Sequence, residues 1–316
     1  MSAGNLIKPR NRTRRDKDRL EPQIQSQSEI LTPTSAQPIP LPAEPPHPRV
    51  FRHAGFTSRF LPGEREISVY VPPGYGEEPG RRYPLLILQD GQNLFDPSTS
   101  FIPGKTWRVA ESADEAIAAG EVEPVVIAGV PNAGERRIAE YTPSRDMKLG
   151  GGEAGKYALL VTRELLPYLR ARYRLLKGPD STGIGGSSLG GLVSMWMGLA
   201  HPEIFGRLAV LSPSVWWNHR YILAYLNDVA PGMHRRPKIW LDVGDMEGRR
   251  TLTDADMLHA RLRKQGWRDE VDLHFETIAG GTHDEASWAE RVQPMLRFLF
   301  PAEQSVGGGL AGVEAL

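Results

Sequence analysis

Short apolar stretches alternate with longer amphipathic ones along most of this chain. Stretches such as 85–89 and 125–130 are apolar almost throughout, which is typical of strands buried on both faces of a sheet. Strands are predicted at 50–58, 66–71, 85–89, 125–130, 181–184, 208–211, 238–243 and 271–277. Helices are predicted at 107–119, 153–173, 189–200, 221–227, 252–265 and 285–300. The alternation predicts an α/β fold with a mostly parallel central sheet and helices on both faces.

Two parts of this pattern are expected to be irregular. The strands at 50–58 and 66–71 are predicted to be antiparallel strands at the start of the sheet, the second ending at Pro-Pro-Gly. The long helix at 153–173 contains Pro167, which lacks a backbone N–H and is expected to kink the helix.

Both ends of the chain lack the alternating pattern. Residues 8–19 hold seven basic and two acidic residues, residues 33–48 hold seven prolines, and residues 307–309 are all glycine. Segments of this kind bury too little apolar surface to fold. We predict a disordered basic and proline-rich tail at 1–48, one folded domain at 49–302, and a second disordered tail at 303–316.

Charge and composition restrict the partners of the chain. Its 38 lysines and arginines balance 38 aspartates and glutamates, so no overall field favours nucleic acid or an anionic membrane. The basic run at 8–19 leaves contact with RNA, a membrane or a partner open, but it has no interleaved aromatic residues, and a solvated tail is predicted. The absence of cysteine among the 316 residues excludes disulfides, a cysteine nucleophile and thiolate metal sites.

The hydropathy of the chain bears on its location. No apolar run reaches the roughly 18 residues of a spanning helix, and the N-terminus has no apolar core like that of a secretory signal. A cytoplasmic protein with no nucleic-acid and no membrane partner is expected, while the oligomeric state is left open.

The segment 186–190, Gly-Ser-Ser-Leu-Gly, fits the G-x-S-x-G pattern of a nucleophile elbow. In that motif a strand turns sharply into a helix with the serine at the apex, so the positions two before and two after it carry almost no side chain. A predicted strand precedes this segment and a buried helix follows it, ending before His201 and Pro202. The alternative is a glycine-rich turn that holds two serines, but the flanking elements favour Ser188 as a nucleophile.

A serine nucleophile needs a base and a carboxylate that orients the base. Among eight histidines, His283 stands in a glycine-containing loop directly after the last predicted strand, at the edge where ligands of parallel sheets bind. The carboxylate is expected after the strand at 238–243, where Asp245 and Glu247 could both reach His283 and spacing does not choose between them. Asp242 lies inside that strand and is expected to point sideways or into a hydrogen bond.

The oxyanion of the tetrahedral intermediate needs two backbone donors. The amide of Leu189 is expected to be one, because it follows the serine at the start of a helix. The second is expected in the loop after the strand at 85–89, where Gly91 permits a turn and the amide of Gln92 is the candidate. Asp90 is expected to brace this loop.

Several of these segments, taken in order, resemble one esterase branch of the α/β hydrolases. That branch includes siderophore (enterobactin and salmochelin) esterases, feruloyl and acetylxylan esterase domains, S-formylglutathione hydrolase and mycolyltransferases. The segments are 69–75, 83–95, the elbow together with 211–217, and 280–283 followed by Trp288. The resemblance spans residues 51–300 and implies an α/β-hydrolase fold for the domain at 49–302.

The resemblance implies a serine carboxylic-ester hydrolase that forms an acyl-enzyme and needs no metal or organic cofactor. In the family the acid often stands three positions after a glycine that ends the strand, here Gly244, which favours Glu247 over Asp245. Arg137 resembles part of a segment beside the active site of siderophore esterases, so it is expected either to hold an anionic part of the substrate or to form a surface salt bridge. The expected substrates are siderophore-like or other small esters, because the absence of an export signal and of disulfides argues against polysaccharide-linked esters.

Two other functions are compatible with the same residues. Acyl transfer to an alcohol or sugar would use the same serine, histidine and acid, and the sequence does not separate it from hydrolysis. The second of these functions is that of a non-catalytic binding protein on a hydrolase fold. Such proteins usually lose the serine or the histidine, and both are present here.

Overall fold

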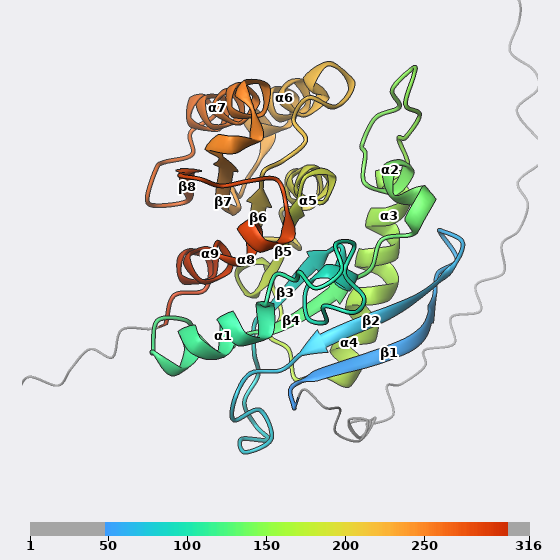
Figure 1. Cartoon of the computed structure of the whole chain (residues 1–316), viewed down its shortest axis with the longest axis vertical. Helices are drawn as coiled ribbons and strands as arrows, with labels where there is room; N and C mark the ends of the chain where they lie inside the picture. Colours follow the sequence, from blue (N-terminus) through green and yellow to red (C-terminus); the bar gives the residue numbers. More distant parts are fainter. Residues whose placement is uncertain (1–47, 303–316) are drawn as a thin grey trace, which may run out of the picture. The chain divides into compact units, whose positions relative to one another are not determined.

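The computed structural model describes residues 48–302, whose strands form one sheet (Figure 1). The strands are β1 (Val50–Thr57), β2 (Glu64–Tyr70), β3 (Leu85–Gln89), β4 (Val126–Val130), β5 (Thr182–Ser187), β6 (Arg207–Leu211), β7 (Lys238–Gly244) and β8 (Leu273–Ile278). Their order across the sheet is β1-β2-β4-β3-β5-β6-β7-β8. β2 pairs antiparallel with both β1 and β4, and all other neighbours are parallel. The predicted mostly parallel sheet and antiparallel first strands are confirmed.

Helices cover both faces of the sheet, as predicted. They are α1 (Val109–Ala118), α2 (Arg137–Glu140), α3 (Ala154–Leu159), α4 (Leu166–Arg172), α5 (Leu189–Ala200), α6 (Trp217–Val229), α7 (Arg249–Lys264), α8 (Glu285–Ala289) and α9 (Val292–Leu299). Alternate residues of a strand face opposite sides. Leu85 and Ile87 of β3 join the buried cluster of α3 to α7, whereas Leu86 and Leu88 join the cluster that contains α1 and α9.

The predicted helix at 285–300 is two helices, α8 and α9, and this is a correction. Pro294 has no N–H with which to bond the carbonyl of Glu290, which favours a break between α8 and α9, whereas a proline in the first turn of α9 is tolerated. The chain therefore turns tightly at Arg291, whose amide donates to the carbonyl of Trp288 at 3.1 Å. This break places Arg291 between the two helices.

The predicted helix at 153–173 runs on through Pro167 but changes its winding. α3 passes into a π-helix, Leu160–Leu165, and α4 begins at Leu166. The wider π turn displaces the carbonyl that the proline ring would otherwise meet. The irregularity expected at Pro167 thus takes the form of a local change in helix type.

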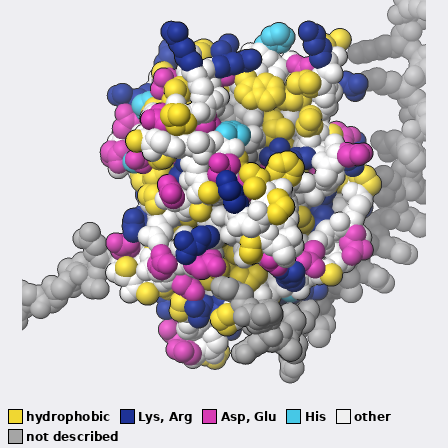
Figure 2. All heavy atoms as spheres, viewed as in Figure 1, with side chains coloured by type: hydrophobic (Ala, Val, Ile, Leu, Met, Phe, Trp, Pro, Cys, Tyr) yellow, Lys and Arg dark blue, Asp and Glu magenta, His cyan; other side chains and the backbone are white. Residues whose placement is uncertain are grey.

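The surface agrees with the balanced charge of the chain. Figure 2 shows acidic and basic side chains interspersed over the face of residues 48–302 presented there. Within the same residues, none of the helices is long and apolar enough to cross a bilayer. The predicted tails lie outside the described residues, except for Pro48.

The parallel strands end at one edge of the sheet, where the loops carry the candidate residues. β3 is followed by η1 (Gly91–Asn93), β5 by α5, β7 by η6 (Asp245–Glu247), and β8 by the loop that leads to α8. Ligands of parallel sheets bind outside the carboxyl ends of the strands. The topology therefore brings segments that are far apart in the sequence to one candidate site.

Candidate active site

Ser188 occupies the sharp turn between β5 and α5. Its backbone, at φ 57° and ψ −122°, lies in a region that residues other than glycine rarely adopt. A Cβ atom at Gly186 would lie 2.8 Å from the Cβ of Gln89, and one at Gly190 would lie 3.0 Å from that atom. The close approach of β3 therefore requires both glycines. The predicted strand-turn-helix geometry is confirmed, and its strain matches a nucleophile elbow.

The structure pairs His283 with Glu247. Nδ1 of His283 lies 2.7 Å from Oε2 of Glu247, and the carboxylate side chain is only 1% exposed. Asp245, the other acid that the sequence left open, accepts a hydrogen bond from the backbone amide of Gly280 at 2.8 Å instead. With Nδ1 directed at the carboxylate, Nε2 of His283 is the nitrogen free to accept a proton.

Glu247 is held ionised by its neighbours. Burial would raise its pKa, but hydrogen bonds from His283, Ser212 and the amide of Gly244 outweigh burial and lower the pKa below its ordinary value. Its Oε1 atom accepts from the Ser212 hydroxyl at 2.5 Å and from the Gly244 amide at 2.8 Å. These donors fix the carboxylate while its Oε2 atom remains for His283.

Ser188 and His283 line one pocket of about 220 Å³. The Ser188 hydroxyl lies 3.3 Å from the Ser214 hydroxyl, and among residues 48–302 it makes no hydrogen bond to His283. His283 is partly exposed and packs edge-on against Trp288, with ring centroids 5.0 Å apart. Hydrogen bonds between a nucleophile and its base are often long in the absence of a substrate. Rotation of the Ser188 side chain would change the distance between its oxygen and Nε2 of His283.

Both predicted oxyanion donors lie at the starts of helices beside Ser188. Leu189 is the first residue of α5, and Gln92 lies in η1 after β3 and lines the pocket. The first amides of a helix have no acceptor within that helix, so these two N–H groups suit an oxyanion. The Gln92 side chain accepts from the amide of Asn132 at 3.2 Å, which ties η1 to the segment after β4.

Arg137 lines the same pocket and pairs with Asp90. Its Nε and Nη2 atoms donate to the two Asp90 oxygens, each at 2.8 Å. Burial would lower the pKa of Arg137, but the pairing with Asp90 raises it overall. The salt bridge that the sequence left as an alternative is therefore present, although it lies at the pocket wall. Asp90 also accepts from Asn132 at 2.7 Å, as a brace of the loop would.

A buried arginine behind the pocket escaped the sequence analysis. Arg291 is 1% exposed and donates to Ser212 and Asp242, each at 2.8 Å, and more weakly to Glu247 at 3.4 Å. It also donates to the carbonyl of Thr282, next to His283, at 3.2 Å. One guanidinium thus connects the acid, the histidine loop and β7.

A signal for Arg291 does exist in the sequence. It is a single arginine directly before the apolar face formed by Val292, Met295, Leu296 and Leu299, where an unpaired charge would be costly to bury. For Ser212, the other partner of Glu247, the sequence gives less indication, because its unusual backbone angle, a φ of 43°, is known only from the fold. Neither residue could be assigned to Glu247 without the tertiary contacts.

Replacing Glu247 with glutamine is expected to destabilise the protein at neutral pH and much less in acid. A lowered folded-state pKa means that the carboxylate stabilises the fold above its ordinary pKa, and that this contribution is lost as pH falls through the lowered value. Urea unfolding should give a loss of about 1–3 kcal/mol near pH 7, shrinking toward pH values of about 3. Asp245→Asn is the matched control, since its exposed carboxylate has one amide donor. A Glu247→Gln deficit that grows in acid would contradict the ionised carboxylate.

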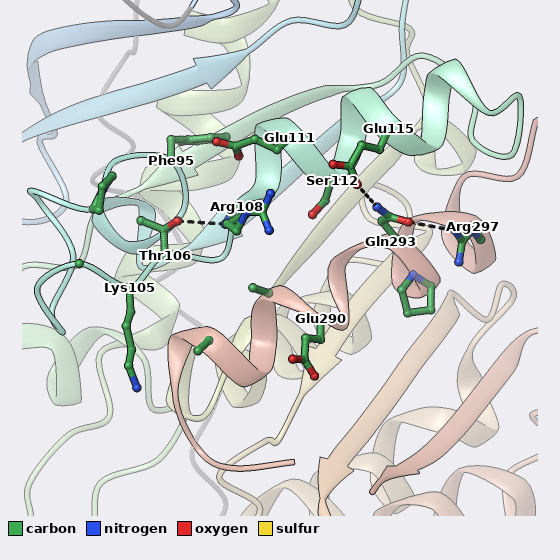
Figure 3. Close-up of a pocket in the computed structure, with 15 residues that line it drawn as sticks. Phe95, Lys105, Thr106, Arg108, Glu111, Ser112, Glu115, Glu290, Gln293 and Arg297 are labelled. Atoms are coloured by element: carbon green, nitrogen blue, oxygen red, sulfur yellow. Dashed lines mark hydrogen bonds between the residues drawn. The ribbon is translucent and has the colours of Figure 1, made fainter. Parts of the chain in front are cut away.

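A larger cavity in residues 48–302 lies elsewhere. It has about 900 Å³ and opens between α1 and the segment containing α8 and α9 (Figure 3). Gln293 bridges Glu115 and Arg297 across part of it, at 2.6 and 3.0 Å. Neither Ser188 nor His283 lines this cavity, so the smaller pocket is the candidate active site. In the described part of the chain, no group of three acidic or histidine side chains could hold a metal ion.

Comparison with known proteins agrees with the fold. The chain belongs to the Putative esterase family, which matches residues 58–299. This membership supports ester hydrolase activity on an α/β-hydrolase fold.

Individual relatives are distant. The Iron(III) salmochelin esterase of Escherichia coli O6:H1 is 28% identical over 247 residues, covering 73% of this chain and 53% of that protein, so this chain spans about half its length. The Uncharacterized protein YbbA of Bacillus subtilis is 25% identical over 265 residues, which cover 79% of this chain and 98% of that protein. The solved structure of the BES protein from Bacillus cereus has a TM-score of 0.66 at 22% identity, and the match covers 85% of this chain and 99% of that one. At this identity the structural likeness shows the fold.

Proposed function

We propose that this protein is a serine carboxylic-ester hydrolase in which Ser188 is the nucleophile, His283 the base and Glu247 the acid. The observation that carries the proposal is the 2.7 Å contact between His283 and Glu247 in a pocket that Ser188 also lines from a strained elbow. That combination supplies a nucleophile, a base and an orienting carboxylate at one place.

The proposed reaction proceeds through an acyl-enzyme. Nε2 of His283 takes the hydroxyl proton as the oxygen of Ser188 attacks the ester carbonyl, and the Leu189 and Gln92 amides stabilise the oxyanion. The protonated His283, held by Glu247, then gives this proton to the departing alcohol. A water molecule loses a proton to His283 and attacks the acyl group, and the acid leaves as Ser188 regains its proton. These steps need no metal or organic cofactor.

The proposed substrates are small esters, siderophore-like ones among them. The relative named Iron(III) salmochelin esterase motivates the siderophore class, and a pocket of about 220 Å³ fits one compact part of such a molecule. Arg137 is proposed to contact the substrate through the N–H groups that Asp90 does not use. Because Asp90 neutralises its charge, we expect Arg137 to bind a neutral acceptor better than a carboxylate. A cytoplasmic location without nucleic-acid or membrane partners remains the prediction from sequence.

Acyl transfer remains the second candidate reaction, since an alcohol could replace water in deacylation. Product analysis with and without added alcohols separates the two reactions. A non-catalytic binding protein is disfavoured by the His283–Glu247 contact, which such a protein has no need to keep.

A fluorophosphonate probe is expected to label this protein at Ser188. The probe reacts with serines that a neighbouring base activates, so peptide mapping should place the adduct on Ser188, and His283→Ala should abolish labelling. The labelled protein should lose its hydrolysis of short-chain, feruloyl and catecholate esters in proportion to labelling. Failure to label, together with no turnover of any ester in this panel, would overturn the proposal.

A further inference from the structure

One acidic side chain in the candidate active-site pocket has no cationic partner. Three charged side chains line the pocket besides His283, namely Asp90, Arg137 and Glu285. Asp90 and Arg137 neutralise one another through their two hydrogen bonds. Within residues 48–302 Glu285 forms no ion pair within 4.0 Å, and Lys105 and Arg137 act on its carboxylate only at longer range. The formal charges of Asp90, Arg137 and Glu285, the three charged residues named above, therefore sum to −1.

Glu285 is held rigidly where the loop after β3 meets α8. It is the first residue of α8 and only 4% exposed. Its Oε1 atom accepts from the side-chain amide of Asn93 in η1 at 3.1 Å, and Asn93 in turn accepts from the amide of Phe101 at 2.9 Å. The carboxylate is thus fixed between the loop that carries Gln92 and the loop that carries His283.

The second oxygen of this carboxylate is unused. Oε2 of Glu285 is buried and has no hydrogen-bond partner in the described part of the chain. A buried carboxylate oxygen without a donor costs free energy that a donor from a ligand would recover. Burial raises the pKa of Glu285, and the nearby charges of Asp284 and Asp90 raise it further, which together outweigh the opposing effect of Lys105.

We propose that Glu285 is a specificity residue that accepts a hydrogen bond from a hydroxyl or ammonium group on the ester substrate. This inference rests on the proposed function and adds the chemical class of the substrate. The excess negative charge of the pocket disfavours substrates with a carboxylate near the ester. Among siderophore-like and other small esters, those with a hydrogen-bond donor close to the ester bond are therefore preferred.

The experiment compares esters of similar size that differ in one group. The acyl series is ethyl butyrate, ethyl 3-hydroxybutyrate, ethyl 3-aminobutyrate and ethyl hydrogen succinate, and the alcohol series is propyl and 3-hydroxypropyl butyrate. In at least one series, an ester with a hydroxyl or ammonium group should have a kcat/KM about tenfold or more above that of the unsubstituted ester, which is ethyl butyrate or propyl butyrate. The succinate half-ester, which carries a carboxylate, should be the poorest substrate of the acyl series.

Two variants assign this preference to Glu285. Glu285→Gln removes the charge and should abolish the preference for the ammonium ester, while Glu285→Leu should abolish the preferences for both donors. Glu290→Gln removes an exposed carboxylate five residues further on and should leave the preferences as they were.

Different outcomes separate failure of this inference from failure of the proposed function. Hydrolysis of all esters at similar kcat/KM, or donor preferences that persist in Glu285→Leu, would overturn the role of Glu285 but leave the esterase standing. Hydrolysis of none, with no fluorophosphonate labelling, would overturn the proposed function. If one variant fails to fold, the other still tests the role of Glu285, and similar kcat/KM values for all esters in the unsubstituted protein would overturn that role in either case.

Discussion

Replacing Ser188 with alanine is expected to reduce kcat/KM for a small ester such as p-nitrophenyl acetate by about a thousandfold or more. The oxygen of Ser188 forms the bond to the acyl group, so no acyl-enzyme can form without it. The loss should fall on kcat, because the pocket that binds the ester is unchanged. Steady-state kinetics and a single-turnover assay for the acyl-enzyme would measure both effects.

The folded state provides the control for this variant. Ser188 contributes one hydrogen bond, to Ser214 at 3.3 Å, so the melting temperature should change little. Combining Ser188→Ala with His283→Ala should cost scarcely more than either substitution alone, because the two residues act as one unit. Activity of Ser188→Ala near that of the unsubstituted protein, or fully additive losses in the double variant, would show that another group is the nucleophile.

Replacing Arg291 with methionine is expected to lower the free energy of unfolding by about 3–5 kcal/mol. The substitution keeps much of the side-chain volume but leaves the fully buried Asp242 without its cation. It also removes a donor from Glu247 and one from the Thr282 carbonyl. Urea unfolding would measure the stability, and kcat should fall as well because the acid and the histidine loop lose a shared contact.

This deficit should depend on pH. Burial raises the pKa of Asp242 to about 6, although Arg291 lowers it. A raised folded-state pKa means that the contribution to stability is present below the ordinary pKa and is lost as pH rises through the folded value. Without Arg291 the pKa rises further, so the deficit should be larger near pH 8 than near pH 5. A deficit that shrinks as pH rises would contradict the assignment of the effect to Asp242.

Two further variants isolate the buried charge as the cause. Asp242→Asn in the Arg291→Met background should recover part of the lost stability, since it removes the uncompensated carboxylate. Arg297→Met lies on α9 and disrupts an exposed pair with Glu121, so it should cost no more than about 1 kcal/mol. An equal loss in the two arginine variants would mean that the buried ion pair is not the source.

Local features of the chain determined the fold class and most of the elements. Almost entirely apolar runs such as 85–89 form strands where helices cover both faces of the sheet, and the bounds of β3 match the prediction. The elbow could also be predicted from residues close together in the chain, because neighbouring glycines make the strained turn possible and the apolar helix follows directly. The errors fell at helix ends and interruptions. The predicted helix at 285–300, for example, is two helices, α8 and α9. The spacing of apolar residues does not show where one helix ends and the next begins before Pro294.

The sequence alone thus determined a mostly parallel α/β sheet, an elbow at Ser188 and a histidine loop at residue 283, since each depends on residues adjacent in the chain. Spacing left Asp245 and Glu247 open and only the family resemblance favoured Glu247, because both acids follow β7 and the choice depends on the direction that each side chain takes from η6. The tertiary structure pairs His283 with Glu247. The tertiary structure also paired Arg137 with Asp90, placed Arg291 behind Glu247, and left Glu285 without a cation. These contacts join residues that are tens of positions apart, and their geometry is set by the packing of helices and loops, which short-range patterns do not encode.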